Sequence, residues 1–568
     1  MKFRNGLAAV VLIAILAAAG YAAQWLTLLG WNAVVKYDSP YARALPSGSG
    51  GTALTGRVVL IVVDGLRVDA SERMTVVNTL RARGASFTAW TGEPSLSLPG
   101  WTAIASGAGP EVSGVTTNWY EGLARVDTLF AAAKRAGVST AVAGSPGWVE
   151  LFGTTVDEHV VVGDPNGDVP ADTLYRVSAE VADGAAGMLR SGQAALVLVH
   201  FPSVDLVGHR FGGASPEYAE AVRRVDDHIG TLLALLDLSA DTVIVTSDHG
   251  HLDQGGHGGW EPIVKRVPLV LAGRAVHAGT QFADVRQIDL APTVAALLGI
   301  PIPAHNQGRP LAEAIDADPS VFGPRWIDQQ RTFYQSQAEV LESDAPAKAA
   351  SDPRVSEVLA AGRAEAIQSV ADDLARTFYA AREERLERER ARRLPIAVAA
   401  ALLPLIGIIW LLRRRLLERA LVGTAVFFVI DYAMFYGRGY AFSLSVFNSE
   451  SQILAFFNQR LIDAALAMTA GALIAGVLAA RRRPADAFLG ALGVGYLTAC
   501  VIVLQVVYFY WQWDIRFAWY LPDLALGFKY YLDLLMVVPV GFLAGLYGIA
   551  ALVARVIARV VIRPQAET

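Results

Sequence analysis

Three segments that lie far apart in the chain carry carboxylates and imidazoles able to bind metal ions. They are Asp64-Gly65, Asp205 with His209, and Asp248-His249 with His257. Each segment follows an apolar run rich in β-branched residues, as expected for side chains at the carboxyl ends of parallel strands. Together they supply three aspartates and three histidines. This set is sufficient for two first-row metal ions about 4 Å apart, an arrangement that catalyses phosphoryl transfer.

Ser97 lies between the first two segments, in Pro94-Ser-Leu-Ser-Leu-Pro99-Gly, and is a candidate nucleophile. A hydroxyl is a poor nucleophile at neutral pH, and coordination to a divalent metal is one way to activate it. Pro99 suits the first turn of a helix over 100–105, which would place Ser97 at a positive helix end. A serine in such a loop is more often a cap or turn residue, so the functional interpretation depends on the surrounding carboxylates.

The remaining histidines are weaker candidates for metal ligands. His257 lies in Gly255-Gly-His-Gly-Gly259, where the flexible backbone lets it return to the metals. His251 is the nearest rival to His257, and His200 could support a ligand from behind. Arg67 is a candidate for contact with the substrate. We place the other histidines outside the site: His159, His228, His277 and His305.

The elements that must position these residues lie between Arg57 and about Arg325, where strand-like and helix-like segments alternate. The run over 58–63 is continuously apolar, as for a strand buried on both faces. Further strands are predicted at 195–199, 242–246 and 268–271, and helices at 71–83, 123–136, 216–238 and 291–298. This alternation predicts an α/β fold, a three-layer sandwich with a mostly parallel central sheet.

Apolar segments long enough to cross a bilayer flank this region. The N-terminal one runs from about Gly6 to Trp31 and is predicted to be an anchor, with a cleaved signal peptide as the alternative. Five more segments follow, at about 395–412, 420–437, 461–480, 487–509 and 530–554. Arginine clusters after the first, third and fifth of these fall on one side of the membrane. The positive-inside rule therefore predicts six spans with both termini in the cytoplasm.

These boundaries divide the chain into five parts. We predict an N-terminal membrane anchor (1–33), a linker rich in Gly, Ser and Ala (34–56) and an extracytoplasmic catalytic domain (57–325). A helical stalk (326–394) then leads into a polytopic membrane domain of about five helices (395–568). The expected location is the cell inner membrane.

Composition excludes several other kinds of site. The formal net charge is −5 and no basic stripe is present, so no nucleic-acid partner is implied. The single cysteine, Cys500, lies in an apolar segment. One cysteine cannot form a disulfide within the chain, and the soluble region has none for a thiolate metal site or a cysteine-derived nucleophile.

The motifs resemble the alkaline phosphatase superfamily, and within it the type I phosphodiesterase/nucleotide pyrophosphatase branch. That branch has Thr or Ser two residues before a Pro, matched by Ser97-Leu-Pro99, and then a Gly-x-x-Pro-Glu-x-x-Gly-like element ending in Asn, matched by 107–114 and Asn118. Its Asp-x-x-Gly-His is Asp205–His209, and its Ser-Asp-His-Gly is Ser247–Gly250. The segments 64–69 and 248–259 also resemble the glycosylphosphatidylinositol ethanolamine-phosphate transferases, which likewise combine an extracytoplasmic domain with multiple spans.

The resemblance implies a site with two divalent ions, identified with zinc. One ion would be held by Asp64, Ser97, Asp248 and His249, and the other by Asp205, His209 and His257. Asn118 would donate to a phosphate oxygen beside the Ser97 backbone N–H. The reaction would pass through a phospho-Ser97 intermediate. No counterpart of the arginine that clamps phosphate in the monoesterases is evident, which favours diesters.

We therefore expect a membrane-anchored, two-metal phosphodiesterase or phosphotransferase that acts on a phosphodiester or lipid head group outside the cytoplasm. Hydrolysis and transfer both remain open because the same intermediate serves both, and the polytopic C-terminal region slightly favours transfer or lipid handling. One alternative is a phosphomonoesterase. A transport or scaffold protein with an inactive enzyme-like domain is another, although all seven ligand positions hold residues able to bind metal.

Overall fold

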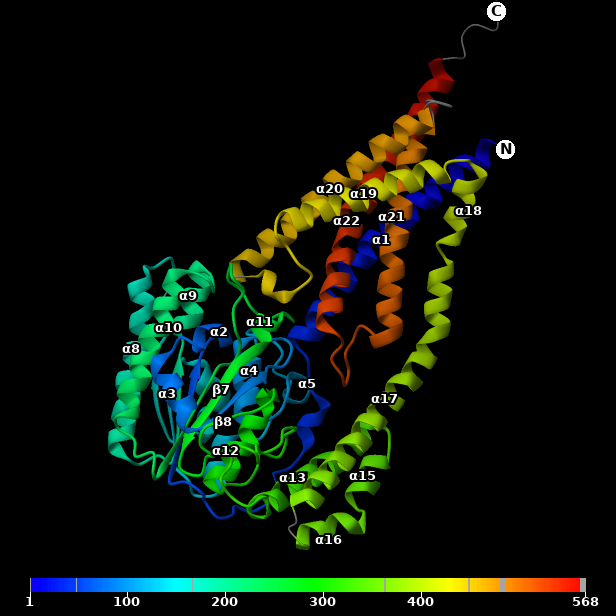
Figure 1. Ribbon diagram of the computed structural model, residues 1–568. Helices are drawn as coiled ribbons and strands as arrows, with labels where there is room; N and C mark the ends of the chain where they lie inside the picture. Colours follow the sequence, from blue (N-terminus) through cyan, green and yellow to red (C-terminus); the bar gives the residue numbers. More distant parts are fainter. Residues whose placement is uncertain are drawn as a thin grey trace, which may run out of the picture. The chain divides into compact units, whose positions relative to one another are not determined.

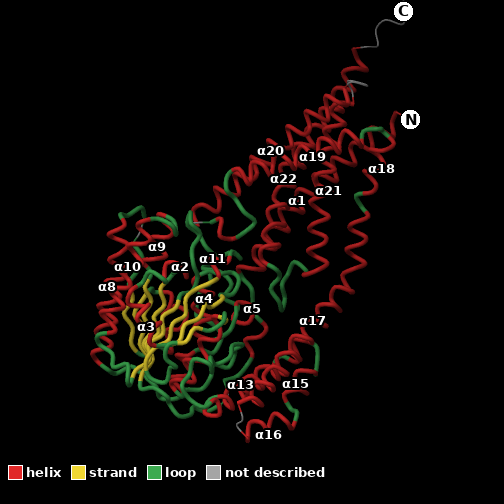
Figure 2. Tube along the Cα trace, in the orientation of Figure 1, coloured by secondary structure: helices red, strands yellow, loops and turns green. Residues whose placement is uncertain are grey.

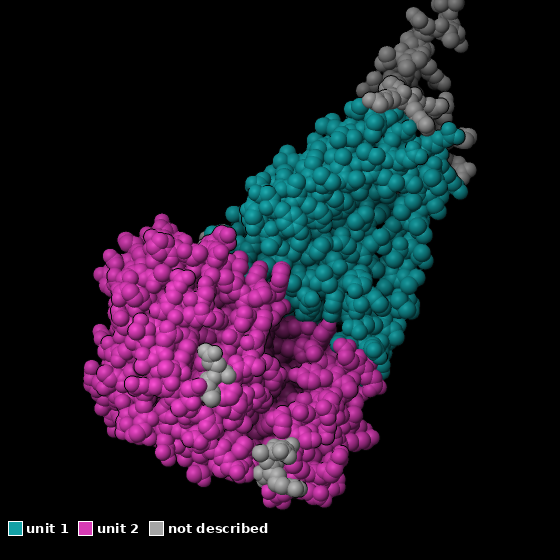
Figure 3. Space-filling view, in the orientation of Figure 1, with its two compact units in different colours: residues 1–33, 386–517, 522–568 teal, residues 34–385, 518–521 magenta. Residues whose placement is uncertain are grey.

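The computed structural model describes residues 2–46, 48–165, 167–361, 364–447, 450–480 and 486–561. The chain forms two compact units, which Figure 3 shows in separate colours. One comprises residues 1–33, 386–517 and 522–568, and the other comprises residues 34–385 and 518–521. The second unit contains all the predicted site residues.

The second unit is built on a nine-stranded sheet with the order β4-β3-β5-β1-β6-β7-β2-β8, in which β9 also pairs with β2. The strands are β1 (Arg57–Val63), β2 (Ala85–Trp90), β3 (Thr140–Gly144), β4 (Glu158–Val161), β5 (Leu196–Phe201), β6 (Asp241–Thr246), β7 (Arg266–Gly273), β8 (Thr280–Gln281) and β9 (Val285–Arg286). Strand β7 is antiparallel to β6 and β2, and the other pairs are parallel. The mostly parallel sheet is therefore confirmed.

Helices cover both faces of this sheet (Figures 1 and 2). One layer contains α3 (Thr75–Arg83), α8 (Ala171–Ser191), α9 (Ser203–Phe211) and α10 (Pro216–Leu233); the other contains α4 (Ser97–Ser106), α6 (Leu129–Arg135), α7 (Gly147–Phe152) and α12 (Leu290–Leu298). Strand β1 faces both layers: Val59 and Ile61 pack in the first core, and Leu60 and Val62 in the second. Burying such side chains stabilises the fold by about 1.5–3 kcal/mol each. The predicted three-layer α/β sandwich is confirmed.

The centre of the sheet positions the site. Strands β5, β1 and β6 are adjacent and parallel, with Val58 opposite both Leu196 and Thr242. Their carboxyl ends therefore meet at one edge of the sheet. Asp64 follows β1 directly, Asp205 lies in the first turn of α9 after β5, and Asp248 lies two residues beyond β6.

Several helices begin or end elsewhere than predicted. The helix predicted at 71–83 is two helices, α2 (Val68–Ser71) and α3. Helix α6 begins at Leu129 because the Thr128 side chain accepts a hydrogen bond from the Ala131 N–H and caps it. Helix α4 begins at Ser97 itself, three residues earlier than predicted.

The second unit continues through α13 (Gly323–Ser336), α14 (Ala338–Leu341), α15 (Ala345–Ala350) and α16 (Pro353–Ala361). The first unit contains most of α1 (Lys2–Val35) together with α18 (Leu405–Arg413), α19 (Leu417–Gly437), α20 (Glu450–Ala480), α21 (Ala487–Trp513) and α22 (Leu524–Val561). Helix α17 (Ala364–Leu402) contributes residues to both units.

Six helical stretches of the described residues are long and apolar enough to cross a membrane: 13–42, 366–413, 417–437, 452–479, 487–513 and 524–550. One is N-terminal and five are C-terminal, as predicted. The span predicted at 395–412 is the last part of a much longer helical stretch. A chain with six such helices is an integral membrane protein.

Charged side chains inside the first unit are paired. Arg460 of α20 donates to both carboxylate oxygens of Asp431 of α19, at 2.8 and 2.7 Å. Asp463 accepts from Arg438 at 3.0 Å. Asp431 and Asp463 are fully buried. These pairs prevent isolated charges in the apolar interior, where they would be costly.

Candidate active site

The structure brings three of the predicted residues around the imidazole of a fourth, His249. Its Nε2 lies 3.3 Å from Asp64 Oδ1, 3.5 Å from Asp248 Oδ2 and 3.2 Å from Ser97 Oγ. Ligand atoms on one tetrahedral zinc ion lie about 3.3 Å apart, as bonds of about 2 Å require. These spacings therefore fit a single metal ion held by Asp64, Ser97, Asp248 and His249.

The remaining three predicted ligands form a second group beside the first. His209 Nε2 lies 3.3 Å from Asp205 Oδ2 and 3.1 Å from His257 Nε2, and His257 Nε2 lies 3.7 Å from Asp205 Oδ1. These spacings also fit one tetrahedral ion. His249 Nε2 is 4.0 Å from Asp205 Oδ1, so the two groups adjoin. All seven predicted ligands lie in one cluster.

The second nitrogen of each imidazole fixes which atom faces the cluster. His257 Nδ1 lies 3.0 Å from the Ser95 carbonyl oxygen, and His249 Nδ1 lies 3.1 Å from the Gly250 carbonyl oxygen. A carbonyl only accepts, so Nδ1 carries the hydrogen in both rings and Nε2 keeps its lone pair. In each ring that Nε2 is the atom directed towards the carboxylates.

The loop that carries Ser97 is tied to the loop that carries His257. Ser95 N donates to the Gly258 carbonyl oxygen at 3.3 Å, and Ser95 Oγ donates to the Gly259 carbonyl oxygen at 2.8 Å. Together with the His257 bond, these contacts fix the distance between the candidate nucleophile and the second ligand group.

The carboxylates of the first group are held from behind. His200 Nε2 lies 2.9 Å from Asp64 Oδ2, and Trp101 Nε1 donates to Asp248 Oδ2 at 2.9 Å. The Gly65 N–H donates to Asp248 Oδ1 at 3.2 Å. Gly65 has φ +70°, a conformation that favours glycine. Such outer contacts orient metal ligands and raise affinity.

The charge distribution suits cations. Burial, and then the charges of Asp248 and Asp205, raise the pKa of Asp64 well above its usual range. Asp64 Oδ1 is buried, with no hydrogen-bond partner among the residues that the structure describes. A divalent ion would satisfy that oxygen and offset the repulsion between carboxylates.

The buried imidazoles of the site favour the neutral form, which is the form that binds metal. Burial, and then His249, lower the pKa of His257 well below its usual range, and burial lowers the pKa of His200 to about 4. Burial alone would raise the pKa of Asp205, but His209 and His251 together hold it well below its usual range. Ionised carboxylates beside neutral imidazoles are the donor set that zinc prefers.

Ser97 and Asn118 lie at the N-terminus of α4. Ser97 is the first residue of this ten-residue helix. Asn118 Oδ1 accepts from the Leu98 N–H at 3.0 Å, which holds its amide beside the helix start. The end of a helix presents N–H groups and positive potential, so phosphate oxygens are stabilised there.

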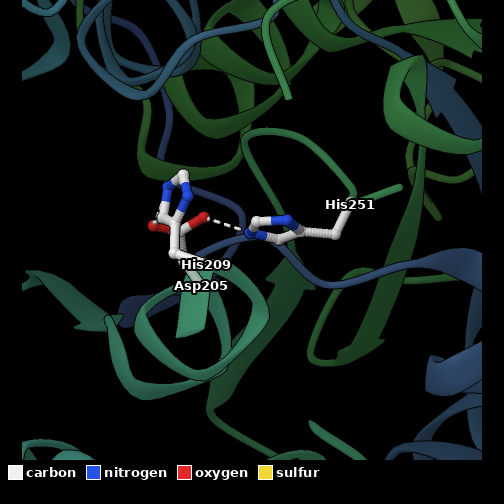
Figure 4. Close-up of side chains that lie close together, drawn as sticks. All are labelled: Asp205, His209 and His251. Atoms are coloured by element: carbon white, nitrogen blue, oxygen red, sulfur yellow. Dashed lines mark hydrogen bonds and ion pairs between the residues drawn. The ribbon is translucent and has the colours of Figure 1, made fainter. Parts of the chain in front are cut away.

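Sequence reasoning left His251 outside the set of metal ligands, as the nearest rival to His257, and the structure places its ring against Asp205. Its Nε2 lies 2.6 Å from Asp205 Oδ1, and the ring is fully buried. Figure 4 shows the Asp205 carboxylate between His209 and His251. Asp205, His209 and His251 form one of the three groups of described residues whose donor atoms are close enough to share an ion. The spacing in Asp248-His-Gly-His251 was the available signal.

Arg67, the candidate for substrate contact, has its guanidinium engaged within the protein. It forms ion pairs with Asp69 at 2.9 Å and with Asp253 at 2.6 Å, and donates to the Gly213 carbonyl oxygen at 3.2 Å. It therefore connects the loop after β1 with the loop that carries His251 and His257.

Comparisons with known proteins agree with this geometry. Residues 58–255 match the family model described as type I phosphodiesterase/nucleotide pyrophosphatase. Human GPI ethanolamine phosphate transferase 1 is 26% identical over 302 residues, which cover 44% of this chain and 32% of the relative. GPI ethanolamine phosphate transferase 2 of Aspergillus fumigatus is 26% identical over 307 residues, which cover 47% of this chain and 40% of the relative. The chain thus spans only about a third of the length of such relatives.

Solved structures also align with part of the chain. Alkaline phosphatase PafA is 13% identical with a TM-score of 0.39, over 46% of this chain and 99% of that one. Murine ectonucleotide pyrophosphatase/phosphodiesterase 5 is 12% identical with a TM-score of 0.36, over 43% of this chain and 96% of that one. The resemblance expected from the motifs is confirmed by the family model and the curated relatives. Residues 58–255 form a phosphodiesterase-type enzyme domain.

Proposed function

We propose that this integral membrane protein is a two-metal phosphodiesterase or phosphotransferase that uses Ser97 as its nucleophile. The observation that carries the proposal is the convergence of seven donor side chains in two adjoining groups, with donor spacings of 3.1 to 3.7 Å. Asp64, Ser97, Asp248 and His249 would hold one zinc ion, and Asp205, His209 and His257 the other. Bound zinc supplies positive charge that favours an ionised hydroxyl and offsets the charge of the phosphate.

The residues of the chain then divide the reaction between them. Ser97 loses its proton and its Oγ forms a bond to phosphorus. The bond between phosphorus and the leaving alcohol breaks, and the oxygen of the leaving alcohol takes up a proton. In the second half, water or an acceptor alcohol attacks phosphorus, and Ser97 is released and protonated again. The chemistry is the same for hydrolysis and for transfer, and only the attacking hydroxyl differs.

Substrate binding would use the start of α4. The Ser97 N–H and the Asn118 side-chain amide would each donate to a non-bridging phosphate oxygen. Both groups lie at the helix end, because Asn118 is held against the Leu98 N–H. A phosphodiester keeps one of its two ester bonds after Ser97 attacks phosphorus. Such a substrate suits a site with these two donors.

We propose a lipid-linked phosphodiester as the substrate, processed on the extracytoplasmic side of the cell inner membrane. Six apolar helices keep the enzyme in the bilayer, where a lipid head group is concentrated. The relatives named GPI ethanolamine phosphate transferases favour transfer of a phosphate-linked head group to an acceptor alcohol.

The test uses the full-length protein in detergent micelles. We expect about two zinc ions per chain by elemental analysis, and faster turnover of an aryl phosphodiester than of the matching monoester. Ser97→Ala should abolish turnover while metal remains bound, and intact-protein mass spectrometry should find a phosphate adduct on the wild type only. Protein without divalent metal, or an active Ser97→Ala variant, would overturn the proposal.

A further inference from the structure

We infer that His251 is a positioning residue for the second metal: it donates a hydrogen bond from Nε2 to Asp205 Oδ1 and so orients that carboxylate. The inference rests on the proposed function, because it concerns how the second ion is held. His251 would then act differently from the proposed ligands His209 and His257, although all three rings lie near the same carboxylate. Figure 4 shows two of them, His209 and His251, beside Asp205.

The distances separate a positioning residue from a ligand. His251 Nε2 lies 2.6 Å from Asp205 Oδ1, which is the distance of a strong hydrogen bond to a carboxylate. Donor atoms on one tetrahedral zinc ion lie about 3.3 Å apart, and a separation as short as 2.6 Å would require severe distortion. The contact of Asp205 Oδ2 with His209, at 3.3 Å, is consistent with shared ligation, and His257 lies no closer than 3.7 Å to Asp205 Oδ1. His251 therefore contacts the carboxylate itself.

The protein makes room for this ring with glycines. A Cβ added at Gly208 would lie 2.6 Å from His251 Cδ2 and 2.7 Å from its Nε2, and a Cβ at Gly65 would lie 2.8 Å from Cδ2. Gly208 lies in α9 between Asp205 and His209, so the ring packs directly against the helix that carries both ligands. A larger residue at Gly208 would require the ring to move from this position.

The buried polar edge of His251 is not explained by packing. Its Nδ1 is buried and has no hydrogen-bond partner among the described residues. A buried polar atom without a partner is destabilising, so an apolar side chain would stabilise the fold better unless the Nε2 bond has a function. The Asp205 bond supplies that function.

The first metal group has the same arrangement. His200 is fully buried and its Nε2 lies 2.9 Å from Asp64 Oδ2, leaving Oδ1 towards His249. Likewise His251 engages Oδ1 of Asp205, while Oδ2 lies nearest His209. Each carboxylate thus has one oxygen fixed by an imidazole behind it. Loss of such outer contacts typically lowers metal affinity 10–100-fold.

The test measures zinc affinity for each of the two sites in the full-length protein, by competition with a chromophoric chelator. His251→Gln keeps an N–H donor at the position of Nε2, and His251→Met removes the donor at similar volume. We expect His251→Met to weaken the second equivalent 10–100-fold and leave the first unchanged, with His251→Gln close to wild type. His305→Met, which removes a buried imidazole bonded to the Asp127 N–H, is the matched control.

The outcomes separate the two proposals. A second equivalent that is as tight in His251→Met as in the wild type overturns the inference. Equal loss in His251→Gln and His251→Met also overturns it, because a direct ligand would behave in that way. Gly208→Ala provides an independent variant, since its Cβ displaces the ring, and it should reproduce the loss seen with His251→Met. Wild-type protein that binds no zinc would instead refute the proposed function.

Discussion

At the scale of single residues, His200 predicts how stability depends on pH. Burial lowers its pKa from 6.5 to about 4. Between pH 6.5 and 4, His200 is protonated in the unfolded chain but neutral in the folded protein. The free energy of unfolding is therefore highest above pH 6.5 and decreases as the pH falls towards 4. The shift corresponds to roughly 3 kcal/mol. As the pH falls from 7 to 4, we expect the free energy of unfolding of the metal-free wild type to decrease relative to that of His200→Gln by about that amount.

The measurement is denaturant unfolding of both proteins in detergent at several pH values, followed by tryptophan fluorescence. Trp101 packs against His200 with ring centroids 4.6 Å apart, so the signal reports on this region. A difference in stability that stays constant from pH 7 to 4 would contradict the assignment.

The sequence was sufficient to select seven side chains that the structure brings together, because Asp64, Asp205 and Asp248 follow buried, mutually parallel strands. It selected His257 as a ligand and left His251 as the rival, without evidence on how either ring points. Both follow Asp248 in one glycine-rich loop, and spacing along a flexible loop does not fix direction. The hydrogen bond from His257 to Ser95 and that from His251 to Asp205 decide the matter. Both depend on contacts distant in sequence.

At the scale of helices, the ion pair between Arg460 of α20 and Asp431 of α19 predicts how strongly contacts between these two helices contribute to stability. Both side chains are buried, and the guanidinium donates to both carboxylate oxygens. Removing one member of a buried pair leaves an uncompensated charge and costs about 3–5 kcal/mol. We expect Arg460→Met to lower the thermal midpoint of unfolding in detergent markedly. Asp463 keeps Arg438 as a partner, so Asp431 carries the loss.

The control is the double variant Asp431→Leu/Arg460→Met, which removes both charges and should recover most of the lost stability. Arg376→Met, at an exposed ion pair with Asp373, should change little. If the double variant is as unstable as Arg460→Met, the loss arises from packing and the buried pair is not the cause.

The sequence predicted the type of many helices and strands, but it predicted their ends and the strand directions less well. The apolar runs identified β1, β5, β6 and β7, but a run of apolar residues carries no sign of strand direction, and β7 proved antiparallel. Strands β2, β3, β4, β8 and β9 escaped prediction. Strand β4 has exposed residues throughout and β2 alternates buried with half-buried ones, so neither forms a long apolar run.

At the scale of the whole molecule, hydropathy identified the six apolar helices because crossing a bilayer demands a length that few soluble helices reach. Orientation depends on a separate signal, the arginine clusters. With Lys2 and Arg4 in the cytoplasm, the first span carries the catalytic unit across the membrane and the second returns the chain at Arg413. Loop charge therefore predicts opposite sides for the catalytic unit and Arg413.

Cysteine labelling tests this orientation, because Cys500 is the only cysteine and its replacement by Ala gives a background without thiols. Ser239 lies exposed in the loop between α10 and β6, and Arg413 ends α18. In cells with an intact plasma membrane, a membrane-impermeant maleimide should label Ser239→Cys and spare Arg413→Cys. Permeabilised cells should label both, which shows that each thiol is reactive. The reverse pattern would place the metal site in the cytoplasm and exclude an extracytoplasmic lipid-linked substrate.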